Sequence, residues 1–156
     1  MENMHKELDS LILFYMNTPD ENKVYKRREG CYGLVENDQG ALAIIKTSTG
    51  HFLPGGGVEA DESLEDSLKR EFIEETGLRI DIDEQYATGS YFFYSTTLEM
   101  DMESYGHFYK CHVLEKVSNQ KEVDHELVWL TSQDAYDKLW LENQKEAVKL
   151  YQQRYK

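Results

Sequence analysis

The sequence predicts an α/β fold in which a mixed β-sheet lies between helices. Segments rich in β-branched and aromatic residues fill most of the chain and indicate strands. Two stretches with helical spacing, residues 63–77 and 143–155, interrupt this strand-rich order. The length of 156 residues is close to that of a single compact core, so we expect one domain over residues 1–156.

The first half of the chain predicts short strands. Residues 5–18 are ambiguous between a short helix and a strand, whereas residues 24–28 are strand-like. Residues 31–36 and 41–46 are expected to pair as a hairpin around the polar turn at 37–40.

The second half combines further strands with two helices. Residues 105–116 are expected to pair with residues 85–95 across a polar, acidic connector at 96–104. The other predicted elements are short strands at 79–82 and 126–130, a helix over 132–139 capped by Thr131, and the C-terminal helix over 143–155.

The central helix carries start and stop signals. Ser63 is a good N-cap, and Asp66 three residues later gives a box-like start. Gly77 is the expected C-terminal stop. Apolar residues spaced by four positions predict the buried stripe, which consists of Leu64, Leu68 and Phe72.

Three acids of this helix lie beside the apolar stripe rather than opposite it. At about 100° per residue, Glu71 lies roughly 20° from Leu64 around the helix axis, and Glu75 falls between Leu64 and Leu68. Glu74 lies at the edge of the stripe on the side of Glu71. Partly burying such a cluster costs several kcal/mol unless a group of opposite charge pairs with it.

Arg70 is one cation and cannot neutralise three acids, whereas a divalent metal ion could. Clustered hard oxygen ligands suit Mg²⁺ or Mn²⁺. The glycines at 55–57 would let the backbone approach a ligand closely just before the helix. The alternative is an acidic surface helix in an acidic protein, with the glycines forming a plain turn.

The stretch from Gly56 to Leu78 resembles the Nudix box, G-x5-E-x7-R-E-U-x-E-E-x-G-U, where U is a bulky aliphatic or aromatic residue. Every specified position is filled, by Gly56, Glu62, Arg70, Glu71, Phe72, Glu74, Glu75, Gly77 and Leu78. The resemblance implies an α/β/α sandwich. It also implies a hydrolase that uses Mg²⁺ or Mn²⁺ to cleave a nucleoside diphosphate linked to another moiety.

The resemblance also implies roles for individual residues. Glu74 and Glu75 are expected to bind the metal, and Glu71 is expected to be a metal ligand or the general base. Arg70 is expected to orient a box glutamate through a salt bridge. The backbone carbonyl of Gly55 is a further expected metal ligand.

Nudix enzymes often use one more glutamate, shortly before a strand that contains Trp, as a metal ligand or base. Glu126, three residues before Trp129, fits this pattern loosely, and the alternative is an ordinary acid at a strand end. Glu122 and Asp124 are weaker candidates for the same role.

Candidates for substrate binding are fewer and less specific. Lys46 and Arg28, with Arg27 beside it, could contact a phosphate, or they could be solvated surface cations. Phe52 is a candidate for stacking on a nucleobase. Residues 91–94 offer further aromatic rings, although strand alternation would place two of the four in the core.

Composition excludes several classes of protein. The net charge of −13 and the lack of a Lys/Arg stripe argue against binding a nucleic-acid polymer. A small phosphorylated substrate remains compatible, because bound metal ions screen its charge. We expect no membrane partner, because no apolar run is long enough to span a bilayer and the N-terminus does not resemble a signal peptide.

The two cysteines, Cys31 and Cys111, predict reduced thiols and a cytoplasmic location. His107 and His112 flank Cys111, but a fourth zinc ligand is lacking. A homodimer is compatible with the resemblance, although no sequence feature demonstrates one.

Three functions are compatible with the sequence. The first is hydrolysis of a nucleoside triphosphate, including oxidised ones, to a monophosphate and pyrophosphate, by analogy with MutT-like Nudix enzymes of similar size. The second is hydrolysis of a nucleotide sugar or a dinucleoside polyphosphate. The third is a Nudix domain that senses a nucleotide without cleaving it, which the complete set of box glutamates disfavours.

Overall fold

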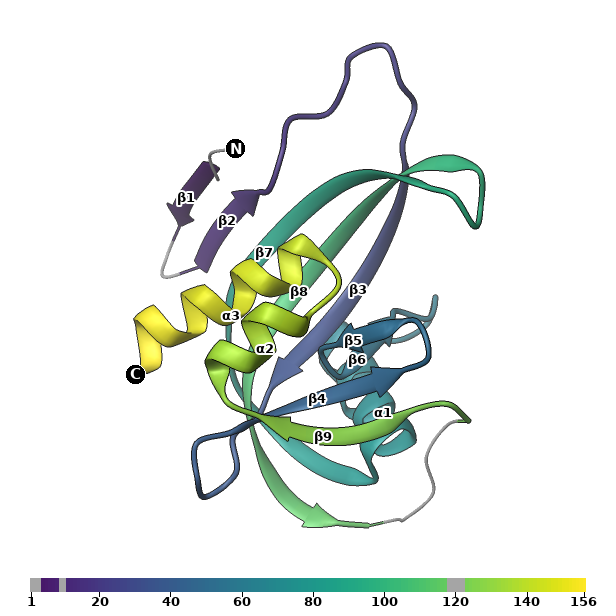
Figure 1. The fold of residues 1–156 in the computed structure, drawn as a ribbon. Helices are drawn as coiled ribbons and strands as arrows, with labels where there is room; N and C mark the ends of the chain where they lie inside the picture. The colour runs from purple at the N-terminus through teal and green to yellow at the C-terminus, as the bar shows by residue number, and fades with distance from the viewer. Residues whose placement is uncertain (1–3, 9–10, 118–122) are drawn as a thin grey trace.

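The computed structural model describes residues 4–8, 11–117 and 123–156 (Figure 1). The strands are β1 (Met4–Leu8), β2 (Leu11–Tyr15), β3 (Lys26–Leu34), β4 (Leu42–Thr47), β5 (Gly50–Phe52), β6 (Gly55–Gly57), β7 (Leu78–Ser95), β8 (Met100–Lys116) and β9 (Glu126–Leu130). The helices are α1 (Leu64–Thr76), α2 (Ser132–Lys138) and α3 (Glu142–Tyr155).

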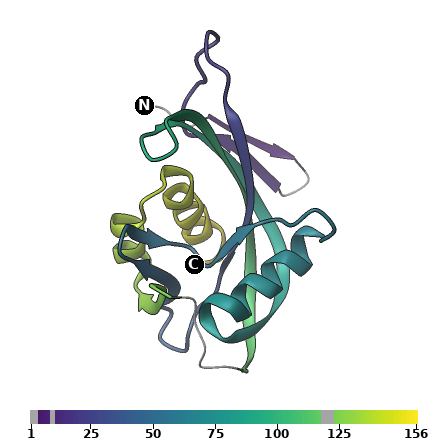
Figure 2. The ribbon, with the colours of Figure 1, turned by 90° about the vertical axis from the view of Figure 1, so that its right-hand side faces the viewer.

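These strands form two sheets. The larger sheet has the order β1-β2-β7-β8-β3-β6, and the smaller one has the order β5-β4-β9. The larger sheet is mixed, because β2–β7 and β3–β8 are parallel pairs and the other pairs are antiparallel. Helix α1 lies on one side of it, and α2 and α3 lie on the other (Figure 2). The predicted α/β sandwich with a mixed sheet is confirmed, and the second sheet is an addition to it.

Each side of the larger sheet has its own hydrophobic core. On the α1 side, the buried cluster contains Leu68 and Phe72 of the helix with Val35. On the α3 side, the cluster contains Leu34 and Tyr151. Neighbours such as Leu34 and Val35 belong to opposite cores because successive residues of an extended chain point to opposite faces. Both faces of the central strands are therefore buried.

The predicted hairpin of residues 31–36 and 41–46 forms only beside its turn, and the two segments do not pair along their length. Strand β3 belongs to the larger sheet, where it pairs with β8 on one side and β6 on the other. Strand β4 belongs to the smaller sheet, between β5 and β9. Backbone bonds between the two segments lie beside the turn, in the Glu36–Leu42 bridge and the hydrogen bond from Ala43 N to Val35 O. Both backbone edges of β3 are already occupied, so β4 could not pair along it.

The expected pairing of residues 85–95 with 105–116 is confirmed, but the predicted connector is much shorter. Strands β7 and β8 pair from Leu78 to Ser95 and from Met100 to Lys116, so the turn occupies only 96–99. The acidic residue Glu103 is compatible with a strand because it is buried against Arg27 and Ser90. At the N-terminus, the ambiguous segment forms β1 and β2.

A row of glycines crosses the larger sheet. Gly57, Gly30, Gly106 and Gly89 are direct neighbours in register on β6, β3, β8 and β7. A Cβ atom on Gly30 would lie 2.5 Å from the hydroxyl of Tyr32, so the Tyr32 ring must lie back along its own strand over Gly30. The missing side chains let aromatic rings lie flat on this part of the sheet.

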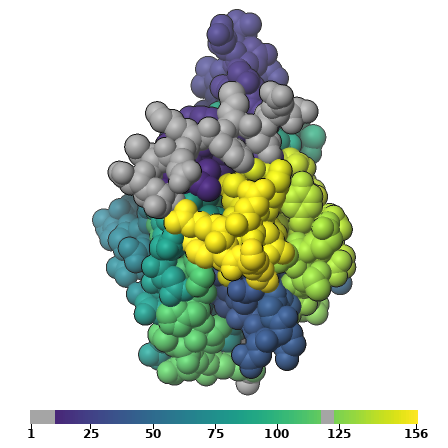
Figure 3. All heavy atoms as spheres, turned by 90° about the vertical axis from the view of Figure 1, so that its left-hand side faces the viewer, coloured from purple at the N-terminus to yellow at the C-terminus, as the bar shows by residue number. Residues whose placement is uncertain are grey.

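Helix α3 forms part of the surface seen in Figure 3, beside α2. Its apolar residues Ala147, Leu150 and Tyr151 are buried against the sheet. None of the described helices has the length and apolarity needed to cross a membrane.

Candidate active site

Helix α1 begins and ends as its sequence predicts. The Asp66 N–H donates to Ser63 Oγ at 3.1 Å, and Gly77 adopts a left-handed conformation with φ of 74°. Phe72 and Leu68 are fully buried, and this packing fixes the rotation of the helix. That rotation brings Glu71 and Glu75 towards the glycine strand β6, where Glu75 is only 6% exposed.

Arg70 is the centre of a network of acids. Its Nε and one terminal nitrogen donate to the two carboxylate oxygens of Glu62, at 2.8 and 2.9 Å. The other terminal nitrogen donates to Glu71 at 3.2 Å and to Glu74 at 3.1 Å. The hydrogen bonds to Glu62 raise the pKa of Arg70 and lower the pKa of Glu62. Arg70 therefore orients two box glutamates, and Glu62 holds Arg70.

Gly55 and Glu75 meet at the free edge of the larger sheet. Gly55 lies opposite Tyr32, while the neighbouring Gly33 N–H donates to Pro54 O at 3.0 Å. Gly55 therefore occupies a non-hydrogen-bonded position, so its N–H and carbonyl both point away from β3. Its N–H donates to Glu75 Oε1 at 2.8 Å. By the same pairing geometry, the carbonyl of Gly55 points away from β3 as its N–H does.

Gly56 provides room for Glu71. A Cβ atom at Gly56 would lie 2.9 Å from the carboxylate carbon of Glu71 and 3.0 Å from each of its oxygens. The glycine loop thus seats the carboxylate directly against the backbone. At the neighbouring Gly57 a Cβ atom would meet nothing within 4 Å.

Cys31 lies underneath this loop and is fully buried. Its thiol approaches Gly56 O at 3.8 Å. Burial raises the pKa of the Cys31 thiol to about 11, and burial also raises the pKa of Cys111. Both thiols are therefore protonated at neutral pH.

His125 is a member of the site that the sequence motifs do not indicate. Its Nδ1 lies 3.0 Å from Glu75 Oε2. One oxygen of Glu75 thus accepts a hydrogen bond from the Gly55 N–H, and the other lies beside the His125 ring. Leu127 is partly buried and lies two residues after His125, so the two side chains share one face of the extended chain. The sequence would have indicated His125 only if it showed which face of β9 points inward.

The structure places Glu126 on the other face of β9. Leu127 packs against the α1 core, as expected for a residue on the same face as His125. Glu126 is the direct neighbour of Lys46 across β4 and β9, so these two exposed side chains share the opposite face. Because Glu126 and Lys46 lie on the face opposite His125, this position disfavours them as members of the site. Their roles stay predictions. Asp124 accepts hydrogen bonds from Ser48, and Glu122 lies outside the described residues.

Arg28 lies on the same face of β3 as Gly30 and Tyr32. Burial raises the pKa of Tyr32 to about 12; the charge of Arg28 opposes this rise, and Glu75 and Glu71 add to it. All three charges therefore act on the Tyr32 hydroxyl. The role of Arg28 in binding a phosphate stays a prediction.

The acids as they stand do not form a chelating group. Within the described ranges, no cluster of three or more His, Cys, Asp or Glu side chains is arranged to hold a metal ion. Arg70 holds Glu71 and Glu74, and the Gly55 N–H holds Glu75, which also lies beside His125. The donor set nevertheless fits a hard divalent cation, because it consists of carboxylate oxygens and one backbone carbonyl at a single edge. Glu74 is 44% exposed and has room to turn.

The comparisons with known proteins agree with this geometry. A model of the NUDIX domain family matches residues 26–151. The chain belongs to the Nudix hydrolase family. The match includes the whole box and both sheets except β1 and β2.

Individual Nudix relatives are more distant. A MutT-like protein from Streptomyces ambofaciens is 39% identical over 83 residues, which cover 51% of this chain and 53% of that protein. The match thus spans about half of that relative. A NUDIX hydrolase from Nitrosomonas europaea has a TM-score of 0.67 at 15% identity, covering 82% of this chain and 90% of its own. An ADP-ribose pyrophosphatase from Streptococcus suis has a TM-score of 0.56 at 13% identity, covering 83% and 94%. At these low identities, the two structural similarities show a shared fold and no more.

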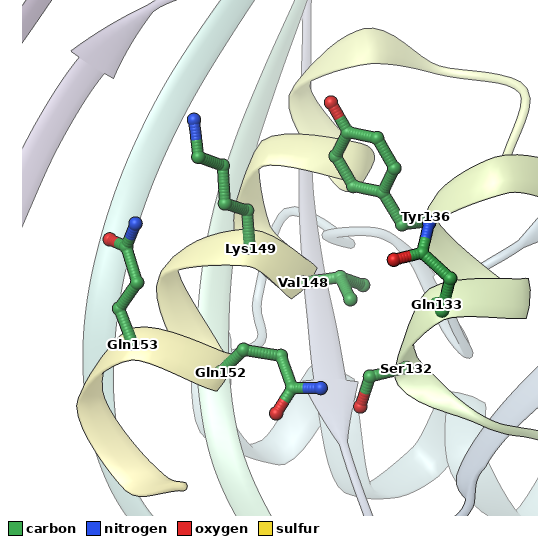
Figure 4. A pocket seen from close by; sticks show the side chains of 7 residues that line it. All are labelled: Ser132, Gln133, Tyr136, Val148, Lys149, Gln152 and Gln153. Atoms are coloured by element: carbon green, nitrogen blue, oxygen red, sulfur yellow. The ribbon is translucent and has the colours of Figure 1, made fainter.

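A separate hollow of about 350 Å³ lies between α2 and α3 (Figure 4). It is lined by polar side chains that include Ser132, Tyr136, Lys149 and Gln152. None of the Nudix box residues lines it. This hollow is therefore not part of the candidate active site.

Proposed function

We propose that this chain is a divalent-metal-dependent pyrophosphohydrolase that cleaves a nucleoside triphosphate, including oxidised forms, to a nucleoside monophosphate and pyrophosphate. The observation that carries the proposal is the gathering of Glu71, Glu74 and Glu75 with the outward carbonyl of Gly55 at one free sheet edge. A pure nucleotide sensor would not need all three acids. We further propose that residues 1–156 act as one domain.

The metal would be Mg²⁺ or Mn²⁺, held by Glu74, Glu75, Glu71 and the carbonyl of Gly55. When bound, it would offset the negative charge of the pyrophosphate and help to activate water. The structure supports this donor set by its chemistry, because hard oxygen ligands match hard cations.

Individual residues would have separate roles in the hydrolysis. Water attacks one phosphorus of the pyrophosphate, the bridging P–O bond breaks, and a carboxylate takes the proton of the water. Glu71 is favoured over Glu126 as this base, because Glu126 lies on the far face of β9. Arg70 keeps Glu71 in place. Arg28, beside Tyr32, would bind a phosphate oxygen.

The test is a product screen with a panel of nucleoside triphosphates, oxidised triphosphates, nucleotide sugars and dinucleoside polyphosphates. Each reaction contains Mg²⁺ or Mn²⁺, with EDTA as the control, and products are separated by chromatography. A monophosphate with pyrophosphate, formed only with metal, supports the proposal. Turnover of nucleotide sugars or dinucleoside polyphosphates alone would mean that these compounds, and not triphosphates, are the substrates. Binding of a nucleotide without turnover would support the sensor.

A further inference from the structure

The hollow between α2 and α3 lies at the open end of this helix pair. The connection between the two helices, residues 139–141, lies at the other end of α2. The hollow is lined by Ser132, Gln133 and Tyr136 of α2 and by Val148, Lys149, Gln152 and Gln153 of α3. Its volume of about 350 Å³ is at the lower end of the range for pockets that bind small molecules. It is therefore separate from the Nudix box and large enough for a small ligand only.

Ser132 gives the hollow a buried hydroxyl group that lacks a partner. The residue is only 6% exposed, and within the described part of the chain its Oγ makes no hydrogen bond. Figure 4 shows the Ser132 side chain on α2 facing that of Gln152 on α3. Leaving a buried hydroxyl without a hydrogen bond destabilises a folded protein. A ligand atom in the hollow would supply the missing partner.

The polar groups around the hollow favour an anion. Lys149 contributes a positive charge, and none of the described lining residues is acidic. Asp137 of α2 is not among them, and its carboxylate accepts a hydrogen bond from Gln133 Nε2 at 3.0 Å. The chain has 30 acidic residues and 17 Lys and Arg residues, so a lining with a cation and no acid differs from its average surface. The field of this hollow therefore differs in sign from that of the protein as a whole.

We propose that the hollow between α2 and α3 binds a small oxyanion of the phosphate class, at a site distinct from the candidate active site. Lys149 would supply the positive charge, while the Ser132 hydroxyl and the Gln152 amide would donate hydrogen bonds. Free phosphate and the phosphate group of a small phosphorylated molecule share this chemistry. The proposal does not depend on the proposed function, because the Nudix box contributes no residue to the hollow.

Binding is measured by NMR on isotope-labelled full-length protein, with EDTA present and the ionic strength held constant. EDTA prevents phosphate from binding through a metal ion at the box acids. The ligands are inorganic phosphate, ribose 5-phosphate and ribose, which lacks the oxyanion. The signals followed are the backbone amide of Ser132 and the side-chain amides of Gln152 and Gln153.

The titrations are repeated for Lys149→Gln and for Lys138→Gln. Both lysines are exposed, so both variants should fold. Lys138 lies in the last turn of α2 and does not line the hollow, so its replacement removes the same charge outside the proposed site. Lys138→Gln is therefore the matched control for a general effect of net charge.

We expect saturable shifts of the hollow signals with both phosphates and not with ribose. Lys149→Gln should raise the Kd for phosphate about tenfold, and Lys138→Gln should change it less than about twofold. Ribose 5-phosphate that binds more tightly than inorganic phosphate would identify a phosphorylated small molecule as the ligand. Inorganic phosphate that binds at least as tightly would identify the free anion.

Ser132→Ala separates a role in binding from a role in the fold. Because the hydroxyl lacks a partner, its removal should leave the midpoint of thermal unfolding unchanged or raise it. The Kd for phosphate should rise by about fivefold in the same variant. A lowered unfolding midpoint with an unchanged Kd would assign the hydroxyl to the fold and contradict the proposal.

The proposal is also overturned if no hollow signal shifts saturably, if ribose causes the same shifts, or if Lys138→Gln weakens binding as much as Lys149→Gln does. Shifts confined to the Nudix box would likewise reject it. Because the titrations contain EDTA and need no turnover, they separate failure of the hollow from failure of the hydrolase. Hydrolysis in the product screen without binding here would reject the hollow alone.

Discussion

Glu75 accepts a 2.8 Å hydrogen bond from the backbone N–H of Gly55, across the free edge of the larger sheet. This single contact joins the helix of the Nudix box to its glycine loop. It fixes one metal-ligand candidate against another, because the carbonyl of the same glycine faces the same edge.

Replacing Glu74 with Gln should abolish metal-dependent turnover, with a loss of at least about 100-fold in kcat. The fold should be unaffected or slightly stabilised, because Glu74 is partly exposed and its removal relieves like-charge repulsion with Glu71. Steady-state kinetics and chemical unfolding check both parts. Glu65→Gln, an exposed acid of the first turn, is the matched control. Unchanged activity in the Glu74 variant would remove this residue from the site.

Gly56→Ala should lower kcat by about tenfold or more, because the new methyl group displaces the Glu71 carboxylate. Gly57→Ala should have little effect, because a Cβ atom there meets nothing within 4 Å. Kinetics of the two single variants provide the comparison. Equal losses in both would indicate a general effect on the loop and not a specific seat for Glu71.

Leu68→Ala should lower the free energy of unfolding by about 2–5 kcal/mol, because Leu68 is fully buried in the α1 core and its truncation leaves a cavity. Ile73→Ala on the same helix should cost far less, since Ile73 is 36% exposed. Urea unfolding of both variants tests this. A small loss at Leu68 would mean that the buried face of α1 is assigned wrongly.

The pair of Arg70 and Glu62 should make stability depend on pH. Arg70 lowers the pKa of Glu62 from its ordinary 4.5, so the pair stabilises the fold above pH 4.5. That contribution is lost as the pH falls through the lowered pKa. The difference in unfolding free energy between wild type and Glu62→Gln should therefore shrink between about pH 7 and pH 3. Glu59→Gln, at a more exposed and distant partner of Arg70, serves as the control. A difference that stays constant over this range would contradict the linkage.

Arg28→Ala should raise KM for a nucleotide substrate by about tenfold, because a phosphate contact is lost, while Lys46→Ala should change it little. Arg28 and the box acids both act on the Tyr32 hydroxyl, whereas Lys46 faces away beside Glu126. Initial rates over a range of substrate concentrations decide between them. An effect of Lys46→Ala equal to that of Arg28→Ala would show that the far face of β4 also contributes to binding.

Local signals predicted α1 completely. Ser63, Gly77 and the spacing of Leu68 and Phe72 fix where the helix begins, where it ends and which face is buried, and the structure agrees. The burial of Glu75 also follows from that spacing. These features depend on residues within a few turns of one another, which is why the sequence reveals them.

Strand partners were harder to predict. Alternation shows which face a residue takes but not which strand lies beside it. The sequence therefore predicts that β3 and β4 pair with each other, whereas the structure pairs β3 with β8 and β4 with β9. The candidate Glu126 rests on the family pattern and its role stays a prediction, whereas no motif indicates His125. Both faces of β9 carry apolar residues, Leu127 on one and Val128 on the other. The sequence therefore does not show whether the odd-numbered or the even-numbered side chains of β9 face α1. Residue roles, the homodimer, the single domain and the cytoplasmic location stay predictions.

The free edge of β6 also bears on the solubility of the protein. An uncovered strand edge presents backbone groups that can pair with another chain, and its glycines offer no side chain to prevent this. Here Glu75 already occupies the outward N–H of Gly55, and the neighbouring acids would repel an approaching strand. The carboxylates that would hold a metal therefore also protect the sheet from self-association, so variants that neutralise several of them at once should aggregate more readily.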